Sequence, residues 1–189
     1  MPAIVLLSGP IASGKTTLAD ELIAHHGFKR LKSSDHLKLL CEQQGHKVSR
    51  GMLQQLGDRL DDQTDYRWLV DDVAKPQFAE DPRHQRWLID SVRKERQVFH
   101  FRSAFGSDVL HVHVSAADAV LKERFDQRLL SGQHHEGATT YDEAITHPNE
   151  ASARALNGIA DHVFDLSAVN PSKAAARIME SITGGLWCT

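Results

Sequence analysis

The chain has 189 residues, 41% of them hydrophobic and 25% charged, which is ordinary for a soluble globular protein. This length predicts a single domain, residues 1–189, that buries about 70% of the surface of the unfolded chain. With 22 Lys and Arg residues against 25 Asp and Glu residues, the net charge is −3. This charge argues against extended nucleic acid or an anionic membrane as a partner. No apolar run reaches the ~18–20 residues of a membrane span, and the N-terminus lacks a secretory signal. We therefore expect a cytoplasmic protein.

The first element is an apolar run, residues 3–7, that predicts a buried strand. It leads into Ser-Gly-Pro-Ile-Ala-Ser-Gly-Lys-Thr-Thr at residues 8–17, and a helix is expected from Lys15 to about residue 26. Gly9, Gly14, Lys15 and Thr16 match the phosphate-binding pattern G-x-x-x-x-G-K-[ST] between a strand and a helix. In that pattern, Lys15 reaches the terminal phosphates and the Thr16 hydroxyl coordinates Mg²⁺. The alternative is a glycine-rich turn without a ligand.

Strand-like and helix-like segments alternate along the rest of the chain, which favours a parallel sheet covered on both faces. The expected strands after the first are residues 28–31, 86–90, 109–114 and 162–166. The expected helices after the first are residues 36–41, 50–62, 65–78, 94–103, 116–130 and a final helix from residue 171.

Residues 131–148 form a polar stretch that predicts either a mobile lid or an ordinary surface loop. His111 and His113 alternate on one expected strand and should face the same side of the sheet. No histidine or cysteine spacing matches a structural zinc site, so hydrogen-bonded histidines are the simpler interpretation.

Two carboxylates follow expected strands. Asp90 ends a buried strand and could hold Mg²⁺ directly or through water, although an Asp after a strand is also a common helix N-cap. Arg93, three residues later, would project into the same crevice and suits an acceptor phosphate. Residues 33–35 are expected to be a strand end that passes into a helix cap. Asp35 could position or deprotonate an acceptor hydroxyl, contact Mg²⁺ through water, or cap a helix.

Several further cations are candidates for phosphate binding. Arg124 and Arg128 lie four residues apart on one helix and share a face, where they could clamp the donor phosphates together with Lys122. A solvated basic surface is the alternative. At the start of another expected helix, Arg50 is a candidate for the acceptor side, and is preferred over Arg59.

Three segments together resemble the deoxynucleoside monophosphate kinases, within the wider nucleoside monophosphate kinase group of phosphate-loop kinases. These are residues 8–17, residues 50–58 with Trp68 after them, and Leu-Ile-Asp-Ser-Val-Arg at residues 88–93. The resemblance implies an α/β three-layer P-loop NTPase fold, with a five-stranded parallel sheet in the order 2-3-1-4-5 and helices on both faces. It also implies an acceptor-binding region at about 33–80 and a helical lid at about 116–148.

The function expected from this resemblance is transfer of the ATP γ-phosphate, with Mg²⁺, to a nucleoside or deoxynucleoside monophosphate. The expected ATP-binding residues are Gly9, Ala12, Ser13, Gly14, Lys15, Thr16 and Thr17. The expected catalytic residues are Lys15, Asp35, Arg93, Arg124 and Arg128. The expected acceptor-binding residues are Asp35, Arg50 and Arg93, and the expected metal-binding residues are Thr16 and Asp90.

Two alternatives stay open. One is phosphorylation of a hydroxyl group, as in the dephospho-CoA kinases that the chain also resembles, and here a carboxylate base such as Asp35 matters more. The other is a regulator that binds a nucleotide without transferring phosphate. The sequence leaves the base and sugar of the acceptor, and the oligomeric state, undetermined.

Overall fold

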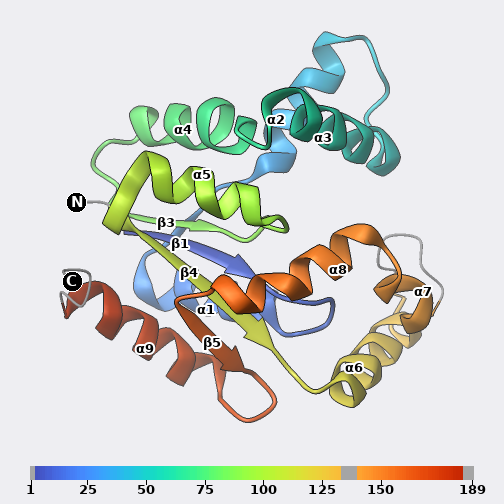
Figure 1. The fold of residues 1–189 in the computed structure, drawn as a ribbon, viewed down its shortest axis with the longest axis vertical. Helices are drawn as coiled ribbons and strands as arrows, with labels where there is room; N and C mark the ends of the chain where they lie inside the picture. The colour runs from blue at the N-terminus through green and yellow to red at the C-terminus, as the bar shows by residue number, and fades with distance from the viewer. Residues whose placement is uncertain (1–2, 133–139, 185–189) are drawn as a thin grey trace.

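A central parallel sheet organises the fold (Figure 1). The computed structural model describes residues 3–132 and 140–184, and only the backbone of Arg50. The sheet has the strand order β2-β3-β1-β4-β5, as the resemblance implied, and every adjacent pair is parallel. Its strands are β1 (Ala3–Ser8), β2 (Lys29–Arg30), β3 (Arg86–Ile89), β4 (Val109–Ser115) and β5 (His162–Asp165).

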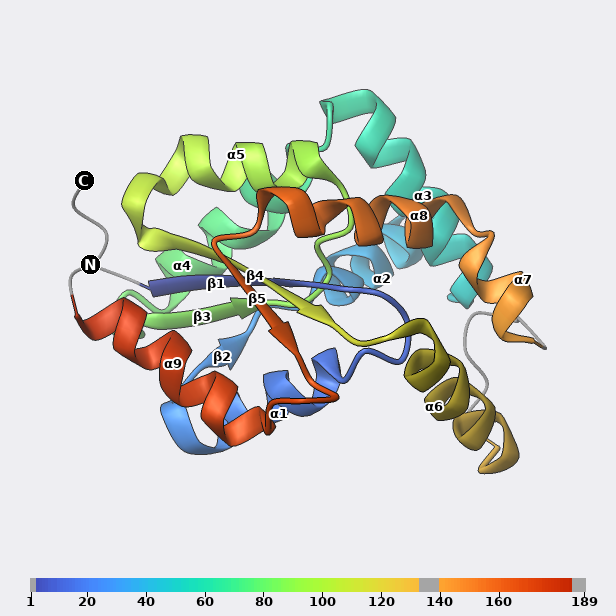
Figure 2. The ribbon, with the colours of Figure 1, turned by 60° about the horizontal axis from the view of Figure 1, so that its bottom comes forward.

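Helices cover both faces of this sheet (Figures 1 and 2). Those lying directly against it are α1 (Lys15–His26) and α9 (Pro171–Thr183) on one face, and α5 (Glu95–Phe105) on the other. Because strand side chains alternate, Val5 and Leu7 of β1 pack with α1 and α9, whereas Ile4 and Leu6 pack in the opposite core with α5. The fold therefore has three layers with an apolar core on each side of the sheet.

The remaining helices include those of the expected acceptor region and lid, which lie toward the carboxyl end of the sheet (Figure 2). Two belong to the expected acceptor region, namely α2 (Ser33–Gln43) and α3 (Arg50–Thr64). Further along the chain come a π-helix at Leu69–Ala74 followed by α4 (Lys75–Glu80), and a 3₁₀ turn at Gly106–Asp108. The expected lid contains α6 (Asp118–Leu130) and α7 (Tyr141–Ile145), and after it come α8 (Pro148–Ala155) and a 3₁₀ turn at Leu156–Ile159.

Three expectations from the sequence need correction. Residues 33–35 do not end a strand, because β2 stops at Arg30 and α2 already begins at Ser33, which places Asp35 in the first turn of that helix. An acidic side chain is favourable there because the helix N-terminus carries partial positive charge. The expected helix 65–78 is instead a π-helix followed by α4, a difference that apolar spacing does not reveal.

The third correction concerns residues 131–148, which are not simply a loop. Thr140 caps α7 through a reciprocal pair of hydrogen bonds with Glu143, and α8 begins at Pro148. Residues 133–139 lie outside the described residues. Across the described ranges, 3–132 and 140–184, no helix is long and apolar enough to cross a membrane.

Candidate active site

The loop between β1 and α1 is shaped to bring backbone N–H groups close to an anion. Gly9 has φ 147°, and a Cβ atom there would lie 2.3 Å from the carbonyl oxygen of Val114. Gly14 has φ 93° and precedes the first turn of α1. Both conformations favour glycine, and the close approach to Val114 on β4 leaves no room for a side chain at position 9. The loop thus presents the N-terminus of α1 to an open space, where negative charge is stabilised.

Two cavities adjoin the loop, and together they gather most of the candidate residues. The larger has a volume of about 900 Å³. It is lined by the expected site residues Gly9, Lys15, Thr16, Asp35, Asp90 and Arg93. The smaller has a volume of about 460 Å³. It is lined by the expected residues Ala12, Gly14, Thr17, Arg124 and Arg128.

Two expected site residues line neither cavity as described. Ser13 is buried, 1% exposed, and its Oγ has no hydrogen-bond partner among the described residues. Arg50 begins α3, but its side chain lies outside the described part of the structure.

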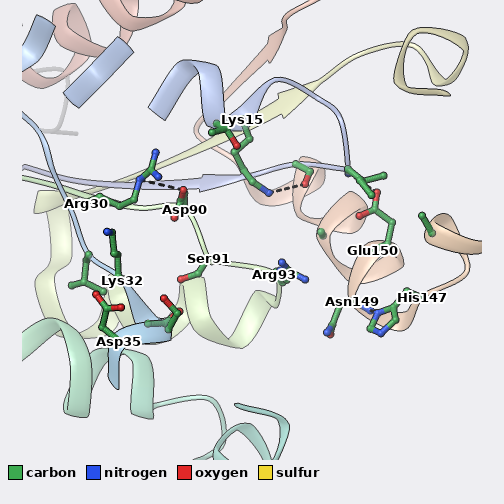
Figure 3. Close-up of a pocket in the computed structure, with 18 of the residues that line it drawn as sticks. Lys15, Arg30, Lys32, Asp35, Asp90, Ser91, Arg93, His147, Asn149 and Glu150 are labelled. Atoms are coloured by element: carbon green, nitrogen blue, oxygen red, sulfur yellow. Dashed lines mark hydrogen bonds and ion pairs between the residues drawn. The ribbon is translucent and has the colours of Figure 1, made fainter. Parts of the chain in front are cut away.

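Asp90 and Asp35 in the larger cavity are each paired with a cation, and Figure 3 shows the pair between Arg30 and Asp90. An Asp90 oxygen lies 3.5 Å from Nε of Arg30, and Arg30 also donates to Asp20 over 2.9 Å. Asp35 accepts a hydrogen bond of 2.9 Å from Lys38, three residues later on α2, and its side chain is 58% exposed. Asp90 therefore has a fixed position near the loop, whereas Asp35 lies on the more open wall of the cavity.

Arg93 enters the cavity from the connection between β3 and α5. Its backbone N–H donates to Gln97 Oε1 over 2.9 Å, so the first turn of α5 fixes the main chain at this point. Figure 3 shows the guanidinium in the space between Ser91 and two residues at the start of α8, the N-cap His147 and Asn149. The Ser91 hydroxyl is buried and has no hydrogen-bond partner among the described residues. This wall thus carries a guanidinium and a hydroxyl.

A wall that sequence reasoning missed comes from α8. The backbone N–H of Ile11, in the phosphate loop, donates to Glu150 Oε1 over 2.8 Å. The Glu150 side chain is 13% exposed, and it also lies 3.4 Å from Nε of Arg154. Pro148 followed two residues later by Glu150 is a sequence signal for a helix start. No local pattern, however, links residue 150 to residue 11.

Arg154 connects the three helices that follow β4. It donates to Asp118 Oδ1 on α6 over 2.7 Å and to the Tyr141 hydroxyl on α7 over 2.8 Å. The hydrogen bond from Arg154 lowers the pKa of the Asp118 carboxyl. Arg154 and Glu150 lie on the same helix, so these contacts hold α6 and α7 against the helix that contacts the loop.

The smaller cavity lies between the loop, α6 and the turn after β5. Arg124 donates to the carbonyl oxygen of Leu166 over 2.9 Å and to that of Ser13 over 3.4 Å. The turn after β5 is fixed by Ser167, whose hydroxyl and backbone N–H both donate to Asp165 Oδ1, and these hydrogen bonds lower the pKa of the Asp165 carboxyl. Arg124 therefore joins the loop to the end of β5, with its guanidinium against the cavity.

A buried polar group lies at the base of the loop. Ser8 Oγ is 2.8 Å from Nε2 of His111 and 3.0 Å from Nδ1 of His113, so both histidines face the same side of β4, as predicted. Burial lowers the pKa of each imidazole to about 4. Both are therefore neutral at pH 7, and they serve the packing beneath the loop. Among the described residues, no group of three or more His, Cys, Asp or Glu side chains could hold a metal ion.

A comparison with models of protein families identifies the family of this chain. Residues 5–140 match the model of a family described as "AAA domain", which spans well over half of the chain. The chain belongs to this family. A comparison with curated proteins finds no match.

Solved structures share the fold. A sugar kinase from Janibacter sp. HTCC2649 is similar with a TM-score of 0.54 and 19% identity, covering 95% of this chain and 93% of that one. Shikimate kinase from Aquifex aeolicus has a TM-score of 0.53 and 15% identity, covering 98% and 99%. Shikimate kinase from Bacteroides thetaiotaomicron has a TM-score of 0.55 and 13% identity, covering 96% and 98%. At these identities the likeness establishes the phosphate-loop kinase fold.

Proposed function

We propose that this chain is a cytoplasmic, ATP- and Mg²⁺-dependent kinase that phosphorylates a nucleoside or deoxynucleoside monophosphate. One observation carries the proposal: two cavities adjoin the phosphate loop, and arginine side chains line each of them. Phosphoryl transfer needs donor and acceptor held in line on opposite sides of the transferred group, with positive charge around it. Two cavities that share one loop offer one site for the donor and one for the acceptor.

The donor occupies the smaller cavity and the loop. The nucleoside lies against Arg124 and the turn at Leu166, and the phosphates run along the loop toward Lys15 and Thr16. A guanidinium beside a base can stack on it, and the loop N–H groups bind the phosphate oxygens. Arg128 lies one turn further along α6 and can add charge near the phosphates.

The residues present fit a magnesium ion. Thr16 and Asp90 line the same cavity and supply a hydroxyl and a carboxylate, and both are hard oxygen ligands of the kind that Mg²⁺ takes together with phosphates and water. The nearby Ser91 hydroxyl, buried without a hydrogen-bond partner in the described residues, adds a third oxygen for a bound water or phosphate. When bound, the ion neutralises charge on the donor phosphates.

The acceptor occupies the larger cavity. We assign its phosphate to Arg93, which lines this cavity together with Lys32. From the sequence we also propose Arg50, whose side chain lies outside the described part of the structure. The acceptor phosphate is already an anion at neutral pH, so its oxygen attacks without a strong general base. Lys15 then stabilises the charge that develops on the transferred group. Arg93 holds the acceptor, and α8 limits access of water.

A hydroxyl-bearing acceptor is the second candidate, and the composition of the larger cavity favours it. The wall contains three carboxylates besides Asp90, namely Asp35, Glu143 and Glu150. Carboxylates are suited to binding hydroxyl groups and to removing the proton of an attacking hydroxyl. The similar solved structures include a sugar kinase and shikimate kinases, whose names indicate acceptors of this kind.

A substrate panel tests the proposal. The purified protein is incubated with Mg-ATP and each common NMP, dNMP, dephospho-CoA, shikimate and a set of sugars, and ADP release and product identity are followed. Transfer to one or a few monophosphates supports the first candidate, and transfer to a hydroxyl acceptor supports the second. ATP binding without transfer to any member of the panel would contradict both and favour a nucleotide-binding regulator.

Once the substrate is identified, the effect of Asp35→Asn on kcat distinguishes a phosphate acceptor from a hydroxyl acceptor. A fall in kcat of only a few-fold is expected for a phosphate acceptor, and a loss of ~10²-fold or more for a hydroxyl acceptor that relies on this carboxylate. Lys38→Gln is the matched control, because it removes the cation that pairs with Asp35 and leaves the carboxylate in place.

A further inference from the structure

Glu150 places a carboxylate directly on the phosphate loop. Its Oε1 accepts a hydrogen bond of 2.8 Å from the backbone N–H of Ile11, and the side chain is only 13% exposed. A loop of this kind directs N–H groups at phosphate oxygens. The carboxylate of Glu150 therefore takes the position of an anion that the loop is built to bind.

The contact lies at the end of the loop that receives the terminal phosphate. Lys15, whose side chain reaches the β- and γ-phosphates in this motif, donates to the carbonyl oxygen of Gly9 over 3.3 Å, two residues before Ile11. Ile11, Lys15 and Thr16 line the larger, acceptor-side cavity. Ala12, Gly14 and Thr17 line the smaller one, where the nucleoside is expected. Under the proposed function, Ile11 thus lies on the acceptor side of the loop, where the donor and acceptor meet.

Other contacts hold Glu150 in this position. Arg154 lies one turn along α8, with its Nε atom 3.4 Å from Glu150 Oε1. Its guanidinium also donates to Asp118 on α6 and to the Tyr141 hydroxyl on α7. On the same helix, the Ser152 hydroxyl accepts a hydrogen bond of 3.2 Å from the ammonium group of Lys94, the N-cap of α5. Because α8 is tied to α5, α6 and α7, displacing Glu150 from Ile11 requires either rotation of its side chain or movement of α8.

We infer that Glu150 is a specificity-determining residue for the donor. Its carboxylate occupies the γ-phosphate end of the loop until a triphosphate displaces it. This inference rests on the proposed ATP-dependent function. A triphosphate and the carboxylate compete for the same N–H group, and both are anions, so they repel each other. A diphosphate stops short of Ile11 and leaves the contact intact. Glu150 therefore lowers the affinity of the chain for ATP relative to ADP. Because Glu150 lies on α8, breaking its hydrogen bond with Ile11 when ATP binds couples donor binding to α8 on the acceptor side.

The test compares the Kd for ATP and for ADP in the wild type and in Glu150→Gln, by calorimetry in the presence of Mg²⁺. The glutamine retains the shape and the acceptor oxygen and removes the charge. From the strength of charge-assisted hydrogen bonds, we expect ATP to bind about tenfold more tightly to the variant, with ADP changed less than about twofold. Glu123→Gln is the control: it removes one charge from α6, where Glu123 is exposed and accepts a hydrogen bond from Gln127.

A second measurement follows the contact itself. In ¹⁵N-labelled protein, the Ile11 amide resonance should move on adding ATP and on replacing Glu150 by alanine, and should move less on adding ADP. Melting temperatures of both variants, measured without nucleotide, identify any general loss of fold.

The outcomes separate this inference from the proposed function. If the wild type binds ATP and the ratio of the two Kd values is the same in Glu150→Gln, the inference is wrong and the function stands. Equal weakening of ATP and ADP would also overturn it, since Glu150 would then act only through the fold. If neither protein binds ATP, the proposed function fails and the inference fails with it.

Discussion

The buried pair His111 and His113 makes the stability of this protein depend on pH in a defined window. Burial lowers the pKa of each imidazole from 6.5 to about 4. Both side chains hydrogen-bond to Ser8, directly before the phosphate loop, and both are at most 2% exposed. In the unfolded chain the same histidines bind a proton at an ordinary pKa. Between pH 6.5 and pH 4 the unfolded state thus holds more protons than the folded state, and acidification favours unfolding.

The magnitude follows from the size of the shift. At 1.36 kcal/mol for each pKa unit, lowering the pH from 7 to 4 removes about 3 kcal/mol from the free energy of unfolding for one such histidine. That is a large part of a typical total of about 5–15 kcal/mol. This contribution of the neutral histidines to the free energy of unfolding is fully present above pH 6.5 and is lost as the pH falls toward 4. His100, whose pKa is also lowered by burial, acts in the same direction.

Urea unfolding at pH 7, 5.5 and 4, followed by the fluorescence of the buried Trp68 and Trp87, measures this loss. His113→Asn should flatten the pH dependence, because the variant has one fewer buried imidazole to protonate. His25→Gln is the control, since that side chain is 65% exposed. An unfolding free energy that stays constant from pH 7 to pH 4, or a His113→Asn slope equal to that of the wild type, would refute the reasoning.

Four further predictions concern the loop and its cations. Lys15→Ala should abolish turnover in the kinase assay and keep the melting temperature, because Lys15, at the start of α1, is not part of the apolar core; unfolding of this variant would contradict its assigned role. Gly9→Ala should lower the unfolding free energy by at least about 2 kcal/mol and weaken ATP binding, since the methyl group would meet the Val114 carbonyl oxygen at 2.3 Å; unchanged urea unfolding would argue against this clash. Arg124→Ala should raise the Kd for ATP about tenfold and leave acceptor KM unchanged, and the reverse pattern would move the donor to the other cavity. Arg93→Ala should raise the acceptor KM with nearly intact ATP binding, whereas equal weakening of both would exclude it from the acceptor site.

The phosphate loop could be located from the sequence because its residues are contiguous. Gly9, Gly14, Lys15 and Thr16 act through a local backbone shape, and an apolar run before them and a helix after them are sufficient to define it. The bounds of β1 and α1 agree with the prediction for the same reason. The sheet order came from a family resemblance and is confirmed.

The environment of the candidate side chains could not be predicted, because it depends on residues far apart in the chain. Asp90 was expected after a strand, but its pairing with Arg30 arises only because β2 and β3 are neighbours in the sheet. Asp35 was expected at a strand end, and its place on α2 followed from how short the edge strand β2 is.

The sequence by itself determined that this chain has a phosphate loop between a strand and a helix, since that information is contained in ten consecutive residues. Only the tertiary structure decided that the loop lies between two cavities, and that Glu150 contacts Ile11 from 139 positions away. The physical reason is that a hydrogen bond between distant residues depends on the path of every element between them. Local patterns of charge and hydrophobicity specify those elements, but they do not specify where each one packs.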